Sequence, residues 1–297
     1  MPDYRPRRAP RHETVLLRGL QTHLTRWGPE PSRTAPPVFL LHGFLDTSDT
    51  FQFLVDAFAA EWPLIALDWR GFGRSEWPQD GYWFPDYVAD LDALLEHFCA
   101  NAPVHLVGHS MGGNVAGLYA GTRPDRVKSF VNLEGFGLPR MVVERAPLRM
   151  REWLDQLRAI PTLKTYDGFE PLAQVIRKRY PRVSPERALF IAQSWGRMEA
   201  DGRVHLVGDP RHKRVNPVLY RRDEAENFWR QITAPVLMLF GELSEFAPKV
   251  GEEETEQAFQ AVIAQIRTLK IPGAGHMMHL ECPEIVAAAI ERFLQEH

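Results

Sequence analysis

The sequence contains few of the residues that would indicate a disulfide-stabilised or zinc-stabilised protein. Only two of its 297 residues are cysteines, Cys99 and Cys282, and each stands alone in the sequence. Two isolated cysteines make neither a disulfide framework nor a zinc site. A reducing, cytoplasmic compartment is therefore the predicted location.

Long apolar runs and a strong excess of one charge are also missing. No apolar run approaches the roughly 18–20 residues of a membrane-spanning helix, so we expect no membrane span. The formal net charge is −3, and no apolar segment of signal-peptide type follows the basic, proline-rich residues 1–13. We expect these residues to form a flexible arm. A few arginines in a slightly acidic chain do not predict a nucleic-acid partner.

Short apolar runs alternate with stretches of helical spacing along most of the chain. Continuous apolar runs are typical of strands buried on both faces, and their alternation with helices indicates parallel strands with crossover helices. We therefore predict an α/β fold with a mostly parallel central sheet and helices on both faces. The expected strands are 38–41, 64–67, 104–107, 128–133, 235–240 and 267–271, and the expected helices are 49–60, 84–99, 111–120, 252–265 and 283–294.

Residues 137–230 interrupt this alternation. They contain eight prolines and no strong strand pattern, and their 19 lysines and arginines against 12 aspartates and glutamates give a net charge of +7. Such asymmetry between segments often marks a separate structural unit. We predict a helical insertion at 137–230 within one α/β core, whose two parts are 1–136 and 231–297.

A G-x-S-x-G motif supplies the candidate nucleophile, Ser110. It occupies residues 108–112, directly after a predicted strand and directly before a predicted helix, which is the context that the motif requires. Glycines on either side permit a turn so tight that a side chain would clash with neighbouring backbone. The turn lifts the serine hydroxyl above the sheet and points the positive end of the following helix at the same place.

A serine hydroxyl needs a base to take its proton. We expect His276 to be that base, because it lies in a glycine-rich loop after the last predicted strand, and open α/β sheets place their sites in such loops. His279 is a weaker alternative nearer the following helix. His109 adjoins Ser110, so its side chain should point elsewhere.

Two backbone N–H groups are candidates for an oxyanion hole. Phe44 follows the first buried strand and Met111 follows the nucleophile, so their N–H groups can meet at one oxygen. We expect His42, which precedes them, to brace its loop and to have no direct role in catalysis.

Four stretches together resemble the α/β-hydrolase superfamily, in its epoxide-hydrolase-like and esterase branches. The resemblance covers about residues 38–136 and 231–296 and implies a helical cap over the site. Relatives that open epoxides or remove halides carry a carboxylate where Ser110 stands; a serine implies an acyl-enzyme instead. The stretches are HGF at 42–44, DWRGFGRS at 68–75, GHSMG at 108–112 and GAGHMMHLECPE at 273–284.

The triad acid departs from the commonest pattern of that superfamily. Most relatives carry aspartate after the seventh strand, and here Ser244 occupies that position. Glu245 is one residue late. Glu134 follows the strand at 128–133, an alternative acid position that the superfamily uses, and we prefer it because orienting a histidine requires a buried carboxylate at the sheet edge.

These residues predict a serine hydrolase that cleaves a small-molecule ester or thioester with a Ser-His-Glu triad, without cofactor or metal. One alternative is hydrolysis of a C–C bond in ring-cleavage products. Another is a catalytically weak receptor for small ligands on the same fold. The charge of residues 137–230 suggests an anionic substrate. The alternative, which we prefer, is that those arginines lie on solvated faces of the helices. No oligomeric state is predicted.

Overall fold

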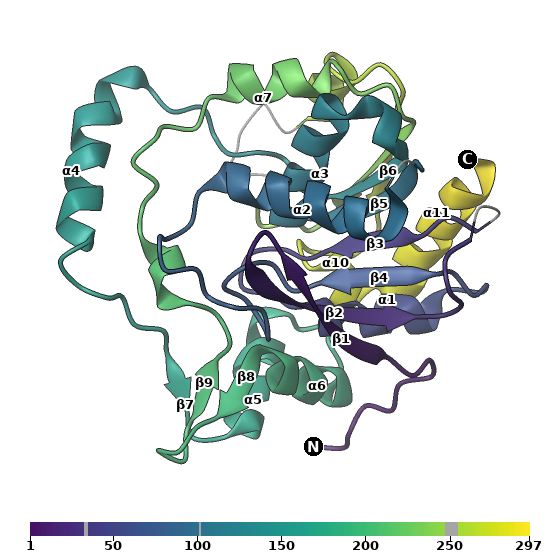
Figure 1. The fold of residues 1–297 in the computed structure, drawn as a ribbon. Coiled ribbons are helices and arrows are strands. Elements are labelled where there is room, and N and C mark those ends of the chain that lie inside the picture. Colours follow the sequence, from purple (N-terminus) through teal and green to yellow (C-terminus); the bar gives the residue numbers. More distant parts are fainter. Residues whose placement is uncertain (33–34, 101, 247–254) are drawn as a thin grey trace.

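The computed structural model describes residues 1–32, 35–100, 102–246 and 255–297. A single eight-stranded sheet runs through the molecule in the order β1-β2-β4-β3-β5-β6-β10-β11 (Figure 1). The six strands from β4 to β11 are parallel, while β1 and β2 are antiparallel to their neighbours. The bounds are β1 Arg11–Leu17, β2 Leu20–Trp27, β3 Val38–Leu41, β4 Leu64–Leu67, β5 Val104–His109, β6 Val127–Leu133, β10 Val236–Gly241 and β11 Ile266–Ile271.

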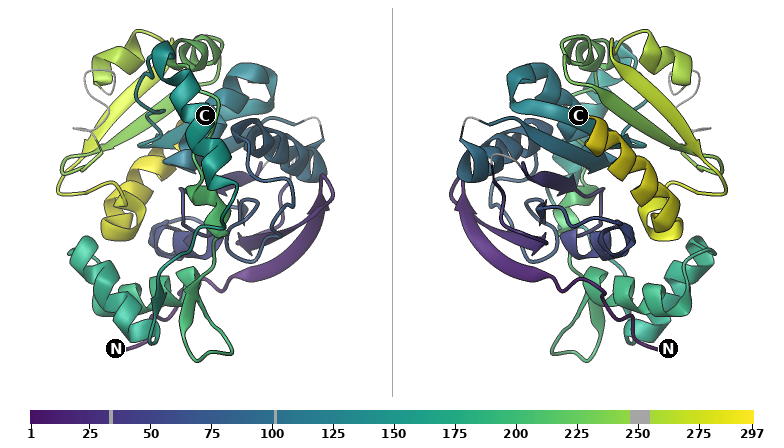
Figure 2. Two further views of the ribbon diagram at one scale, coloured as in Figure 1. Left: turned by 90° about the vertical axis from the view of Figure 1, so that its left-hand side faces the viewer. Right: turned by 90° about the vertical axis from the view of Figure 1, so that its right-hand side faces the viewer.

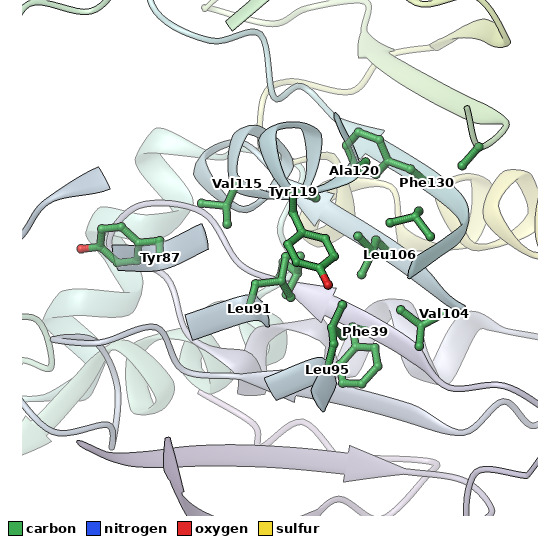
Figure 3. Packing of buried hydrophobic residues seen from close by; sticks show 14 of the residues in the cluster. Phe39, Tyr87, Leu91, Leu95, Val104, Leu106, Val115, Tyr119, Ala120 and Phe130 are labelled. Atoms are coloured by element: carbon green, nitrogen blue, oxygen red, sulfur yellow. The ribbon is translucent and has the colours of Figure 1, made fainter. Parts of the chain in front are cut away.

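Helices cover both faces of this sheet, as predicted. Two clusters of buried apolar side chains join these helices to the sheet. One lies between α2, α3 and α7 and one face of the sheet, and the other lies between α1, α10 and α11 and the opposite face. Figure 3 shows the first cluster, in which Tyr119 of α3 and Leu95 of α2 lie near Phe39 of β3. The bounds are α1 Gln52–Ala57, α2 Phe84–Cys99, α3 Met111–Thr122, α7 Arg222–Trp229, α9 Glu256–Gln260, α10 Met278–Glu281 and α11 Pro283–Glu296.

The amino-terminal part of the chain differs from the expectation. Residues 11–27 form the β1–β2 hairpin at one edge of the sheet. The preceding residues form no flexible arm: the Tyr4 hydroxyl and the backbone N–H groups of Arg7 and Arg8 all donate hydrogen bonds to the Asp56 carboxylate. A buried carboxylate requires hydrogen-bond donors, and these bonds hold the amino-terminal residues against α1.

Two expected helices are shorter than predicted. The one at 49–60 becomes the 3₁₀ turn Ser48–Phe51 followed by α1. The one at 252–265 contains α9, and its first three residues lie outside the described part of the chain.

Residues 137–230 connect β6 to β10 and contain strands as well as helices. A three-stranded antiparallel sheet in the order β7-β9-β8 lies beside α5 and α6, where only helices were expected (Figures 1 and 2). The strands are only two or three residues long, too short for a periodic pattern to reveal. The bounds are α4 Ala146–Gln156, β7 Thr165–Tyr166, α5 Phe169–Arg179, α6 Pro185–Trp195, β8 Gly196–Met198 and β9 Val204–Leu206.

Helices α5 and α6 are anchored to the core, whereas α4 is not. Apolar residues of α5 and α6 form a third buried cluster with Met277 and Leu280. None of the α4 residues is buried, and the helix stands apart from the central sheet in Figure 1. Polar contacts join α4 to the chain that leads to α7: Arg149 donates to the Asn216 carbonyl, and Gln156 accepts from the Val215 N–H.

Candidate active site

The turn between β5 and α3 holds Ser110 in a strained conformation. Its φ is 50° and its ψ is −114°, which side-chain-bearing residues rarely adopt. A Cβ at Gly108 would lie 2.6 Å from the Gly112 carbonyl oxygen, and a Cβ at Gly112 would lie 2.1 Å from that of Leu41. Only glycine fits at either position, so packing of the turn against β3 enforces the geometry of the serine.

Glu134 and His276 meet at the carboxyl ends of β6 and β11. The Glu134 Oε2 lies 2.7 Å from the His276 Nδ1, and the two residues are 2% and 6% exposed. Glu134 has a φ of 55°, at the point where the chain leaves β6. Histidine hydrogens are assigned from their partners: Nδ1 must carry a proton to donate to a carboxylate, which leaves Nε2 free to accept one.

Two further donors hold the Glu134 carboxylate. The Ser244 hydroxyl donates to Oε2 at 2.7 Å, and the Gly241 N–H donates to Oε1 at 2.6 Å. Ser244 occupies the position where the resemblance led us to expect an aspartate, and its hydroxyl binds the carboxylate of Glu134. This role of Ser244 was not predicted from the sequence, because the interaction joins residues 110 positions apart.

Glu245, the alternative acid, does not contact the imidazole ring of His276. Its side chain is exposed, and its carboxylate lies 3.4 Å from the backbone nitrogen of His276. The structure therefore brings Glu134, and not Glu245, to the ring nitrogen of His276.

The loop after β3 passes directly over the turn that holds Ser110. A Cβ at Gly43 would lie 3.2 Å from the Cβ of Ser110, so the next N–H, that of Phe44, lies near the serine. The N–H of Met111 is in the first turn of α3, where helical N–H groups have no intrahelical partner. Within the described residues, neither N–H donates a backbone hydrogen bond or one to a side chain.

His42 braces this loop, as expected. Its Nδ1 donates to the Gly43 carbonyl at 2.7 Å, and its Nε2 accepts from the Trp69 N–H at 2.9 Å. Burial lowers the pKa of His42, so the ring stays neutral, which this pair of hydrogen bonds requires.

The other two histidines near the site are bound elsewhere. The Nε2 of His109 donates to the His276 carbonyl at 3.0 Å, and burial holds the pKa of His109 well below its usual value. The Nε2 of His279 lies 3.3 Å from Asp46 Oδ2. Asp46, His109 and His279 place possible metal-ligating atoms within 4.8 Å of one another, but Asp46 is already occupied by hydrogen bonds from Trp195 and Thr50. Asp46 and His279 therefore form a hydrogen-bonded pair, and the His109 ring packs against His279 with ring centroids 4.3 Å apart.

A cavity of about 1,680 Å³ opens above Ser110 and His276. Its walls are mainly apolar and come both from the core and from residues 137–230. Five arginines of that segment also line it. Arg211 and Arg221 form ion pairs with Asp209 and Asp223. The other three are Arg149, Arg179 and Arg214. In the described residues, no carboxylate lies within ion-pair distance of any of the three.

No helix in the described parts of the chain has both the length and the apolar character needed to cross a membrane.

Comparison with known proteins identifies the family of this chain. The family described as "alpha/beta hydrolase fold" matches residues 36–283. A serine hydrolase-like protein of Danio rerio is 30% identical over 285 residues, covering 91% of this chain and 83% of that protein. A 2-(acetamidomethylene)succinate hydrolase of Mesorhizobium japonicum is 26% identical, with 88% of each chain covered.

Solved structures agree with this assignment. A thioesterase domain from the curacin biosynthetic pathway superposes with a TM-score of 0.82 at 24% identity, covering 95% of this chain and 99% of that domain. A hypothetical protein of Pseudomonas aeruginosa PAO1 superposes with a TM-score of 0.81 at 25% identity, covering 95% and 96% of the two chains. The predicted resemblance is confirmed: this chain belongs to the α/β hydrolase fold family.

Proposed function

We propose that this protein is a serine hydrolase that cleaves a carboxylic ester or thioester through an acyl-enzyme. The observation that carries the proposal is the 2.7 Å contact between Glu134 and His276, in one cavity with a strained Ser110. A buried carboxylate that accepts from Nδ1 prepares the other ring nitrogen to act as a base.

In the proposed reaction, the Ser110 hydroxyl oxygen attacks the carbonyl carbon and the His276 Nε2 accepts its proton. Glu134 orients the ring and stabilises the imidazolium that forms. The N–H groups of Phe44 and Met111 donate to the oxyanion, and removal of one such donor typically costs about 10²–10³-fold in kcat. His276 then protonates the leaving group, and a water molecule activated by the same nitrogen releases the acid.

The cavity supports a substrate with a bulky apolar acyl group. Its volume of about 1,680 Å³ exceeds the roughly 300–1,000 Å³ typical of sites for drug-sized ligands. If a short ester were bound, most of the apolar wall of the cavity would remain in contact with water. We therefore infer a large acyl group on the substrate.

The unpaired arginines support an anionic group on that substrate. Arg149 and Arg214 donate only to backbone carbonyls, those of Asn216 and Ala159. Guanidinium groups without a carboxylate partner at the wall of an apolar cavity favour a carboxylate or phosphate on the ligand. A carboxylate-bearing ester and a thioester of a phosphate-bearing carrier both fit this chemistry.

Hydrolysis of a C–C bond could use the same nucleophile and base, and a small-ligand receptor would use neither. A fluorophosphonate probe combined with a panel of p-nitrophenyl esters of increasing chain length separates these functions. We expect covalent labelling and a rate that rises with acyl length. Absence of labelling would favour a receptor, and labelling without ester turnover would favour C–C hydrolysis.

A further inference from the structure

The Asp46 carboxylate joins three segments that surround the proposed site. It belongs to the loop that carries Phe44, and it contacts one residue of α6 and one residue of α10. The α6 contact is a hydrogen bond of 2.7 Å from the indole Nε1 of Trp195 to Oδ1. Because Trp195 also lines the cavity, this bond leads directly from the substrate space to the loop.

On the loop side, Asp46 holds a tight turn in place. Its backbone N–H donates to the Gly43 carbonyl at 3.3 Å, and Leu45 between them has a φ of 58°. The Oδ1 also accepts from the Thr50 hydroxyl at 2.7 Å and from the Thr47 N–H at 2.9 Å. A non-glycine residue in the left-handed region persists only where its surroundings enforce it, and these bonds do so beside the Phe44 N–H.

On the side of the base, Asp46 reaches the loop of His276 through His279. The His279 Nε2 donates to Oδ2 at 3.3 Å, and its ring lies 4.3 Å from the His109 ring. His109 in turn donates to the His276 carbonyl at 3.0 Å. Although burial alone would raise the pKa of Asp46, the bonds from His279 and Trp195 lower it, so the carboxylate stays charged and keeps these donors.

We propose that Asp46 is a positioning residue, through which contact of the acyl group with Trp195 is transmitted to the Phe44 turn and to the His276 loop. The inference rests on the proposed function. It predicts that a long acyl chain, which reaches Trp195, is processed faster than a short one for a reason other than tighter binding. The relevant measurement is therefore kcat, not KM.

The test compares kcat and KM for p-nitrophenyl decanoate and p-nitrophenyl acetate in wild type and Trp195→Phe. The substitution keeps an aromatic ring in the cavity wall and removes only the N–H donor. Loss of a hydrogen bond to a charged acceptor corresponds to about tenfold in rate. We expect kcat for decanoate to fall by about this factor, towards the acetate value, so that the ratio of decanoate to acetate kcat falls with it.

Trp62→Phe is the matched control. The Trp62 indole also donates to a carboxylate, that of Glu291 at 3.1 Å, but it lies outside the cavity lining. This variant should leave both kcat values unchanged. Asp46→Asn places an amide N–H opposite a donor, so it should lower kcat for decanoate at least as much as Trp195→Phe does. The double variant Asp46→Asn/Trp195→Phe should show no further loss.

An unchanged ratio of decanoate to acetate kcat in Trp195→Phe would overturn the inference, as would a change confined to KM. An equal fall for both esters would also overturn it, since that outcome indicates a general structural role. Labelling of the wild type by a fluorophosphonate keeps the two proposals apart. Without labelling, the proposed function itself fails; with labelling and an unchanged ratio, only the role of Asp46 fails.

Discussion

Replacing Glu134 by glutamine perturbs the proposed site with almost no change in shape. The carboxylate accepts three hydrogen bonds, from the His276 Nδ1, the Ser244 hydroxyl and the Gly241 N–H. The serine hydroxyl can rotate to become an acceptor, but the Gly241 N–H can only donate. The NH₂ group of a glutamine side chain at this position must therefore face either the Nδ1–H of His276 or the N–H of Gly241, each of which is a donor.

Each orientation of the amide has a specific consequence. If the amide nitrogen faces His276, Nδ1 must become the acceptor, so the proton moves to Nε2, the nitrogen that should receive the Ser110 proton. If it faces Gly241, two donors meet in a buried place at a cost of about 1–3 kcal/mol. The first arrangement relieves that conflict and leaves the wrong tautomer, for which kcat falls on the order of 10³–10⁴-fold in triads of this kind.

The assay is steady-state turnover of a p-nitrophenyl ester by Glu134→Gln, with circular dichroism to verify that the variant is folded. Glu245→Gln is the control, because the Glu245 side chain is exposed and reaches only backbone. We expect the control to change kcat less than about threefold, as is usual for exposed charges. The reverse ranking of the two variants would refute the assignment of the acid.

Two further predictions concern charge. For an ester that bears a carboxylate, kcat/KM should fall as the salt concentration rises from low to physiological, where screening acts over about 8 Å, while kcat/KM for a neutral isostere should change little. Replacing both Arg149 and Arg214 by glutamine should flatten this salt dependence. Equal salt dependence for both esters in the wild type would contradict the proposal of an anionic substrate. Burial lowers the pKa of His105 to about 4, so between pH 6.5 and 4 the unfolded chain binds a proton there that the folded chain does not. The free energy of unfolding should therefore decrease as the pH is lowered from 6.5 to 4, by up to about 1.4 kcal/mol per pH unit. Urea unfolding at pH 7 and pH 5 should show a smaller loss of stability for His105→Gln than for the wild type. An equal loss in both proteins would show that His105 is not the cause.

The core of the fold was predictable because its signals are local. All six parallel strands begin within one residue of the predicted start. Strands β3, β4, β5 and β10 are buried throughout and β6 is buried except at one residue, whereas β11 at the sheet edge is partly exposed. Helix α2 spans the predicted residues 84–99, since its amphipathic spacing is regular and Pro85 marks its first turn. The turn that holds Ser110 was recognisable for the same reason: its glycines are required by contacts within the turn and with β3.

Features that depend on distant contacts were not predictable. Strand β1 lies at the sheet edge and is mostly exposed, so it lacks the apolar run that reveals an interior strand. The first ten residues have a composition typical of a free arm, yet Asp56 binds them. Nothing near Ser244 in the sequence indicates that its hydroxyl meets Glu134, and nothing near Trp195 indicates that its indole meets Asp46.

The most direct test of the proposed function is the site at which a fluorophosphonate probe attaches. The purified protein is incubated with the probe, digested, and analysed by mass spectrometry. We expect one adduct on the peptide that contains Ser110, no adduct on the folded Ser110→Ala variant, and loss of esterase activity in step with labelling. Labelling of Ser110→Ala, or a folded wild-type protein that takes up no probe, would contradict the proposal.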